Sequence, residues 1–216
     1  MKKILVVGDS YADHHEVKTY KADSFPIWPE ILANKWDYSL LNEAKCGMGC
    51  KGIFNNYIDL TSKIKFDIAI VMWTYVKRID IEHKPGDYLP LHPDVIETID
   101  KQSKPFKSLE LLRYMYLINI LSEKLNIPTF QVSGTNTHLD RNILYSPLFD
   151  KIDDKNIWGW PFCRQLNGKC LKKELADDEL LKFNPEKYGS DGHPNEKGHQ
   201  KMAQIIGDFI ESRIQI

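Results

Sequence analysis

Short apolar runs alternate with longer amphipathic stretches along the chain, and this alternation limits the possible folds more than any other feature of the sequence. Runs with strand character occupy residues 4–7, 38–41, 66–73 and 127–132. Because helices between successive strands place those strands side by side and parallel, the pattern predicts an α/β fold with a parallel sheet. A fifth strand cannot be identified from the pattern.

The intervening stretches have the spacing of helices that bury one face. We predict four helices. The first begins near Ser24, and the others cover residues 52–63, 108–125 and 195–214. Pro26 should lie in the first turn of the first helix, and Ser108 should cap the third. Two segments, 76–105 and 139–188, interrupt the pattern. Long insertions of this kind often serve as lids or substrate loops.

Size and charge restrict the class of protein. The chain has 216 residues, of which 42% are hydrophobic and 27% are charged. This mixture suffices for one buried core, and no linker or repeat divides the chain, so we expect a single domain over residues 1–216. The formal net charge of −1 favours neither nucleic acid nor an anionic membrane as a partner. We expect an uncharged or mixed-charge ligand, and the sequence does not indicate an oligomeric state.

Targeting signals and metal motifs are not evident. The apolar run at residues 4–7 is much too short for the core of a signal peptide, and no later stretch reaches about 20 apolar residues, the length of a membrane-spanning helix. We therefore expect a cytoplasmic protein. Neither pair of cysteines has the two-residue spacing of a zinc knuckle, so we predict reduced thiols and no metal or cofactor. The cysteines are Cys46, Cys50, Cys163 and Cys170.

Two polar segments near opposite ends of the chain carry the candidate chemistry. Gly-Asp-Ser at residues 8–10 directly follows the first predicted strand, and Asp-Gly-His-Pro at residues 191–194 directly precedes the last predicted helix. Loops at the carboxyl ends of parallel strands face a common crevice. A serine hydroxyl is a weak nucleophile unless a base removes its proton and a carboxylate orients that base. We assign these three roles to Ser10, His193 and Asp191.

These two segments resemble the first and last sequence blocks of the SGNH, or GDSL-like, hydrolases. The resemblance implies a three-layer α/β/α sandwich with a flavodoxin-like parallel sheet. It also implies a serine ester hydrolase that acts on a small acyl ester or a carbohydrate O-acetyl ester through an acyl-enzyme. The family's second block is a glycine whose backbone N–H joins the oxyanion hole. Gly47 takes that place here, with Gly49 as the alternative, and the N–H of Ser10 is the second donor.

Two features depart from the family pattern. The third block normally supplies an Asn as a further oxyanion donor, but the end of the third predicted strand has no Asn. We expect the hydroxyl of Thr74 to replace it, with Tyr75 or Arg78 as alternatives. The family usually places two residues between its Asp and its His, whereas one residue separates Asp191 from His193. The shorter spacing leaves another carboxylate or a backbone carbonyl as the alternative orienting group.

Other polar and aromatic residues have weaker claims. Trp158 and Trp160 lie in an aromatic stretch that can stack on a sugar ring or clamp an acyl chain, so they are our candidate substrate-binding residues, although large aromatics commonly pack the core. We interpret His14 and His15 as solvated loop residues. We interpret His199 as a surface or capping residue.

Three other functions stay open besides the ester hydrolase. An O-acyltransferase would differ only in that a sugar hydroxyl outcompetes water for the acyl-enzyme. A catalytically idle SGNH-fold protein with a binding or structural role is favoured by the missing Asn. A flavodoxin-like nucleotide binder ranks last, because the loop after the first strand is acidic and would repel phosphate.

Overall fold

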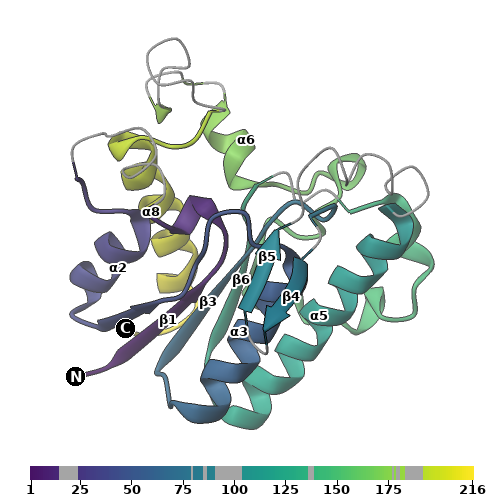
Figure 1. Cartoon of the computed structure of the whole chain (residues 1–216), viewed down its shortest axis with the longest axis horizontal. Helices are drawn as coiled ribbons and strands as arrows, with labels where there is room; N and C mark the ends of the chain where they lie inside the picture. The colour runs from purple at the N-terminus through teal and green to yellow at the C-terminus, as the bar shows by residue number, and fades with distance from the viewer. Residues whose placement is uncertain are drawn as a thin grey trace.

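A five-stranded sheet forms the centre of the protein (Figure 1). The computed structural model describes residues 1–14, 24–78, 80–84, 87–90, 104–135, 139–176, 178, 181–182 and 192–216. The sheet has the strand order β2-β1-β3-β6-β7, and all four pairings are parallel. Its strands are β1 (Lys3–Val7), β2 (Ser39–Asn42), β3 (Ile68–Trp73), β6 (Thr129–Ser133) and β7 (Ile157–Trp158). The predicted α/β fold with a parallel sheet is confirmed.

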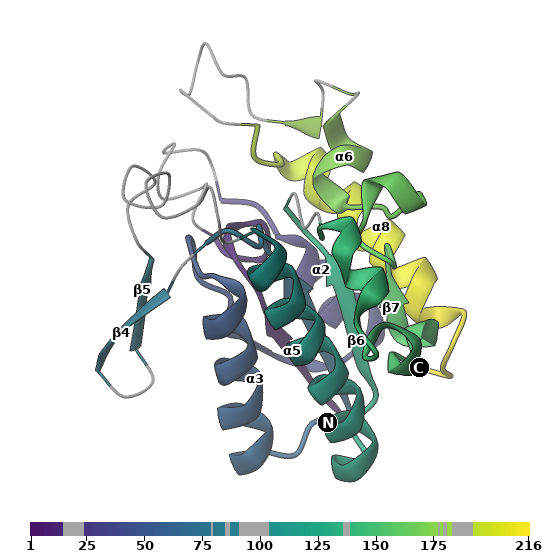
Figure 2. The same cartoon turned by 90° about the vertical axis from the view of Figure 1, so that its right-hand side faces the viewer.

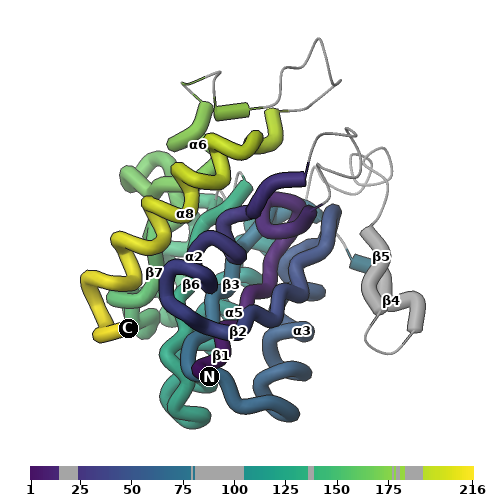
Figure 3. Tube along the Cα trace, turned by 90° about the vertical axis from the view of Figure 1, so that its left-hand side faces the viewer, coloured from purple at the N-terminus to yellow at the C-terminus, as the bar shows by residue number. Residues whose placement is uncertain are grey.

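Helices cover both faces of this sheet and make it the middle layer of three (Figure 2). One face carries α3 (Cys50–Lys63) and α5 (Lys104–Leu125). The other face carries α2 (Trp28–Trp36) and α8 (Glu196–Glu211), which lie side by side (Figure 3). Because alternate residues of a strand point to opposite faces, the sheet separates two hydrophobic cores.

Strand β1 illustrates this division between the two cores. Leu5 and Val7 pack on the α3 and α5 side, whereas Ile4 and Val6 pack on the α2 and α8 side. All four side chains are fully buried. A strand with no solvent-facing side is typical of a parallel sheet that helices cover on both faces, and it explains why this part of the sequence is an uninterrupted apolar run.

The remaining elements are short and lie mostly in the two segments that interrupt the sequence pattern. A two-stranded antiparallel hairpin stands apart from the central sheet. It consists of β4 (Asp80–Lys84) and β5 (Asp87–Pro90). One short helix is α6 (Leu171–Ala176). The 3-10 turns are η1 (Ser10–Ala12), η2 (Arg141–Tyr145), η3 (Phe149–Lys151), η4 (Asp154–Asn156) and η5 (Arg164–Leu166).

Helix boundaries differ from the prediction at two N-termini. The first helix begins at Trp28, with Pro29 rather than Pro26 in its first turn. Helix α5 begins at Lys104, so Ser108 lies inside the helix and is not its cap. The Ser108 hydroxyl is fully buried and accepts a hydrogen bond from the backbone N–H of Asp140 at 2.9 Å. This serine therefore fastens the loop that follows β6 to α5.

The last helix begins where the sequence indicates. Asn195 is its N-cap, and the Asn195 side chain accepts a hydrogen bond from the N–H of Gly198 at 3.1 Å. This capping fixes the direction in which the chain enters the helix immediately after His193. In the part of the chain that the structure describes, every helix is too short or too polar to cross a lipid bilayer.

Candidate active site

Ser10 lies at the carboxyl end of β1, in the first residue of the 3-10 turn η1. Gly8 leaves the strand in close contact with β3, because a Cβ atom at this position would lie 3.2 Å from Cβ of Met72. Asp9 then caps the turn, and its Oδ1 accepts a hydrogen bond from the N–H of Tyr11 at 3.1 Å. The sequence Gly-Asp-Ser thus forms a tight, capped turn that holds Ser10 at the strand end.

His193 lies next to this serine. Its Nε2 atom is 2.9 Å from the Ser10 hydroxyl oxygen, and both side chains are buried. Gly192 has a φ of 88°, a left-handed conformation that glycine adopts without strain. The Tyr11 hydroxyl donates to the Gly192 carbonyl at 3.3 Å, and the Tyr11 ring packs against the imidazole with ring centroids 5.2 Å apart. The geometry suits transfer of the serine proton to the imidazole.

The loop that follows β2 contains the two candidate oxyanion donors Gly47 and Gly49, and we call residues 47–49 the glycine loop. The contacts of the two backbone N–H groups differ. The N–H of Gly49 donates to Oδ1 of Asp80 at 2.7 Å, so this donor is engaged. Gly47 has a φ of 79°, and among the described residues its N–H has no hydrogen-bond partner. This contrast favours Gly47 over Gly49 as a donor to substrate. It also explains the second glycine, because a Cβ at position 49 would lie 2.7 Å from the Asp80 carboxylate.

Asp9 is the centre of a buried polar network directly behind the serine. Its carboxylate is fully buried, and its Oδ2 atom receives three hydrogen bonds. The Thr74 hydroxyl donates at 2.5 Å, the Thr135 hydroxyl at 2.8 Å and the Arg78 guanidinium at 2.9 Å. These donors lie in the segments that follow β3 and β6. The network therefore ties the serine turn to two neighbouring strands.

Comparison with solved structures identifies the fold of the chain. A psychrotrophic esterase from Pseudoalteromonas sp. superimposes with a TM-score of 0.52 over 98% of each chain, at 15% identity. A protein from Desulfitobacterium hafniense assigned to the lipolytic G-D-S-L family gives 0.50, over 97% of this chain and 99% of that chain, at 12% identity. This chain has the SGNH hydrolase fold. An acetyl xylan esterase has the same fold, with a TM-score of 0.51 over 99% of this chain and 100% of that chain, at 14% identity.

Sequence comparisons do not find these relationships. No family model matches the chain, and no curated protein matches it. The SGNH fold is therefore recognised from the two short blocks around Ser10 and His193 and from the arrangement of strands and helices.

Within the SGNH fold, Thr74 binds the carboxylate of Asp9. A carboxylate only accepts hydrogen bonds, so the single hydroxyl proton of Thr74 is directed to Asp9. The same hydroxyl oxygen lies 3.0 Å from that of Thr135. In this geometry Thr74 supports the serine turn through Asp9, and its donation to a substrate oxyanion stays a prediction. The sequence does not predict a role for Thr135. Its position just after the fourth apolar run corresponds to that of Thr74 after the third.

The other predicted site residues are Asp191, Trp158 and Trp160. Asp191 lies outside the described residues, so its role as the orienting carboxylate stays a prediction. The two candidate tryptophans are half-buried and pack against different cores of the SGNH fold: Trp158 on the α2 and α8 side, and Trp160 on the α3 and α5 side. Trp160 stacks on Phe149, with ring centroids 5.1 Å apart.

The histidines near the site also differ from one another. His14 is half-buried, and its Nε2 atom lies 2.8 Å from Oε1 of Glu30. His15 lies outside the described residues. The interpretation of His199 as a surface residue is wrong, because the imidazole is fully buried. Its Nδ1 accepts a hydrogen bond at 3.3 Å from the N–H of Trp28, the first residue of α2, and so caps that helix. Burial lowers the pKa of His199 to about 3, so its ring is neutral.

Cys50 does not compete with Ser10 as the nucleophile. All four cysteines are free thiols. Cys50 contacts the end of β3, with Sγ 3.6 Å from the Thr74 carbonyl oxygen. Burial raises the pKa of Cys50 to about 12, so the thiol keeps its proton. Among the described residues, no group of three or more histidine, cysteine or acidic side chains could hold a metal ion.

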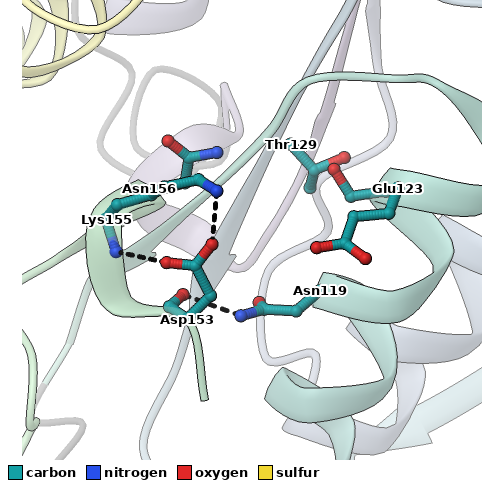
Figure 4. A pocket seen from close by; sticks show the side chains of 7 residues that line it. Asn119, Glu123, Thr129, Asp153, Lys155 and Asn156 are labelled. Atoms are coloured by element: carbon teal, nitrogen blue, oxygen red, sulfur yellow. Dashed lines mark hydrogen bonds and ion pairs between the residues drawn. The ribbon is translucent and has the colours of Figure 1, made fainter. Parts of the chain in front are cut away.

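A separate polar pocket lies at the opposite end of the sheet (Figure 4). Thr129, which lines it, is the first residue of β6, whereas Ser10 follows the last residue of β1. Polar groups in this pocket satisfy one another: Asn119 donates to the Asp153 carbonyl at 2.7 Å, and Lys155 lies 2.5 Å from the Asp153 carboxylate. The pocket is therefore separate from the serine and histidine.

Proposed function

We propose that the protein is a serine ester hydrolase that acts on a small acyl ester or a carbohydrate O-acetyl ester through an acyl-enzyme. The observation that carries this proposal is the distance of 2.9 Å between Ser10 Oγ and His193 Nε2. A buried serine–histidine pair at the carboxyl edge of a parallel sheet has the geometry that an activated nucleophile requires.

In the first half of the reaction, Ser10 Oγ attacks the ester carbonyl carbon while its proton passes to Nε2 of His193. Negative charge then develops on the former carbonyl oxygen. The N–H groups of Ser10 and Gly47 stabilise this oxyanion, because both belong to turns that place backbone donors beside the serine. The C–O bond to the alcohol breaks, His193 returns the proton to the leaving oxygen, and the acyl group stays on Ser10.

In the second half, a water molecule attacks the acyl carbon and gives a proton to His193. The bond to Ser10 breaks, the serine recovers its proton, and the carboxylic acid leaves. Asp191 is our proposed orienting group for His193. Trp158 and Trp160 are proposed to border the substrate, since their half-buried indoles leave part of each ring accessible.

The structural neighbours support this class of reaction. Two of them are an esterase and an acetyl xylan esterase. The second supports an O-acetylated carbohydrate as the substrate class. A near-neutral net charge of −1 suits such an uncharged ester better than a strongly anionic substrate.

Hydrolysis of p-nitrophenyl acetate tests the proposal. We expect turnover by the native protein, and we expect Ser10→Ala and His193→Ala to remove it while leaving the fold intact by circular dichroism. Turnover that both variants retain would contradict the assignment. Addition of a sugar acceptor separates the alternatives: a transferase would form the acetylated sugar in preference to acetate, whereas an idle binding protein would release no p-nitrophenol.

A further inference from the structure

The buried charge of Asp9 requires a partner. Its carboxylate is 0% exposed, and among the described residues Arg78 is the cation that contacts it, at 2.9 Å. A buried carboxylate without a countercharge is strongly unfavourable, whereas hydroxyl donors such as Thr74 and Thr135 supply hydrogen bonds but no positive charge. Arg78 therefore supplies the countercharge to the Asp9 carboxylate behind Ser10.

Arg78 also contacts the glycine loop. The same guanidinium nitrogen that binds Asp9 donates to the Met48 carbonyl at 3.4 Å. Met48 lies directly after Gly47, the proposed oxyanion donor. One cationic group thus contacts the turn that carries the nucleophile and the loop that carries the second backbone donor.

The segment that carries Arg78 is itself fastened to the same loop. Two residues further on, Asp80 accepts hydrogen bonds from the N–H groups of Gly49 and Gly52, at 2.7 and 2.8 Å. A Cβ atom at position 52 would lie 2.9 Å from the Met48 side chain and 3.2 Å from the Asp80 carboxylate. Asp80 therefore fixes the start of α3, and Arg78 projects from a segment that cannot shift independently of the glycine loop.

We propose that Arg78 is a positioning residue, which holds the serine turn and the glycine loop at a fixed separation through Asp9 and Met48. Its catalytic consequence rests on the proposed hydrolase function, since two donors stabilise an oxyanion only if both point at the same oxygen atom. Arg78 lies in the segment after β3, where the third block of the SGNH hydrolases normally supplies an Asn and this chain has none. It acts by aligning the two remaining donors and does not itself contact substrate.

Hydrogen exchange measured by mass spectrometry tests whether Arg78 holds the serine turn and the glycine loop in place, and this test does not depend on catalysis. In Arg78→Met, amide exchange should become about tenfold faster or more in peptides covering residues 8–13 and 45–50. Arg213→Met is the matched control, because Arg213 also donates to backbone carbonyls but lies at the far end of α8. The control should leave both peptides unchanged. Equal exchange of both peptides in the native protein and Arg78→Met would overturn the proposal.

Steady-state kinetics with p-nitrophenyl acetate tests the catalytic part. Arg78→Met should lower kcat on the order of 10- to 100-fold with KM changed less than about twofold, as expected from misplaced donors. Arg78→Lys should recover at least about half of the native kcat, because it restores the charge. Asp9→Asn combined with Arg78→Met should have a higher kcat than Arg78→Met alone, because it removes the unpaired buried charge.

The outcomes separate the two proposals. A native protein that is no more active than Ser10→Ala would reject the hydrolase function, and the exchange experiment would still decide the role of Arg78 in the loops. Native activity together with a kcat of Arg78→Met within twofold of the native value would reject the catalytic role of Arg78. If Arg78→Met does not fold, Arg78→Gln takes its place with the same criteria, because it keeps an N–H donor and lacks the charge.

Discussion

The Nε2 atom of His193 lies 2.9 Å from the hydroxyl oxygen of Ser10, although 183 positions separate the two residues in the chain. Ser10 follows the first strand of the sheet, and His193 precedes the last helix. A parallel sheet with helices on both faces brings the loops at its carboxyl edge together, so the fold itself creates this contact. The local sequence around either residue does not by itself predict that the two side chains meet.

The network behind Ser10 leads to a prediction about Thr74. Replacement of Thr74 by Val keeps the β-branched shape but removes one hydrogen bond to the buried Asp9 carboxylate. We expect the free energy of unfolding to fall by about 1.5 to 3 kcal/mol, as for other hydrogen bonds to charged groups. Urea denaturation measures this loss. A drop in kcat of tenfold or more with unchanged stability would instead show that Thr74 donates directly to the oxyanion.

His199 makes stability depend on pH. Its pKa is about 3 in the folded protein because the ring is buried, and about 6.5 in an unfolded chain. The unfolded state therefore binds more protons between these values. The stability that neutral His199 contributes is fully present above about pH 6.5 and is lost progressively as the pH falls toward 3. At pH 5 the loss amounts to about 2 kcal/mol.

Urea denaturation of native protein and His199→Asn at pH 7 and pH 5 measures this contribution. Asn keeps an acceptor for the N–H of Trp28 but does not titrate in this range. We expect the variant to lose about 2 kcal/mol less than the native protein between the two pH values. Identical pH dependence of the two proteins would disprove this account of His199.

Trp160 has a packing role and a proposed binding role, and one substitution separates them. Trp160→Leu removes the stacking contact with Phe149, so we expect a stability loss of about 1 to 2 kcal/mol. If Trp160 also borders the substrate, KM for an acetylated sugar should rise at least about threefold with kcat unchanged. An unchanged KM would leave Trp160 as a packing residue only.

Much of the fold follows from local patterns in the sequence. Three buried strands, β1, β3 and β6, and the half-buried edge strand β2 appear as apolar runs, because helices cover both faces of the sheet. Ser10 directly follows the first predicted strand, and His193 directly precedes the last predicted helix. These positions allowed the sequence to predict that the two residues form one site. Strand β7 escaped prediction because Ile157–Trp158 is too short to show a period and depends on pairing with β6.

Roles that depend on long-range contacts could not be predicted. The sequence does not reveal that Asp9 is buried, so its partners Thr74, Thr135 and Arg78 could not be assigned to it. The polar character of His199 similarly suggested the surface, but the imidazole is fully buried and contacts the N–H of Trp28 and the ring of Phe25. In each case the contacts of a buried polar residue come from parts of the chain distant in sequence, and no local pattern records those contacts.

The measurement that tests the central claim most directly is the intact mass of the protein after treatment with a fluorophosphonate, because this reagent reports an activated serine whatever the natural substrate is. Our account predicts one adduct, located at Ser10 by peptide mass analysis, with no adduct in Ser10→Ala and much slower labelling in His193→Ala. A folded native protein that remains unlabelled, or that carries its adduct at a different residue, would contradict the assignment of Ser10 and His193 as a catalytic pair.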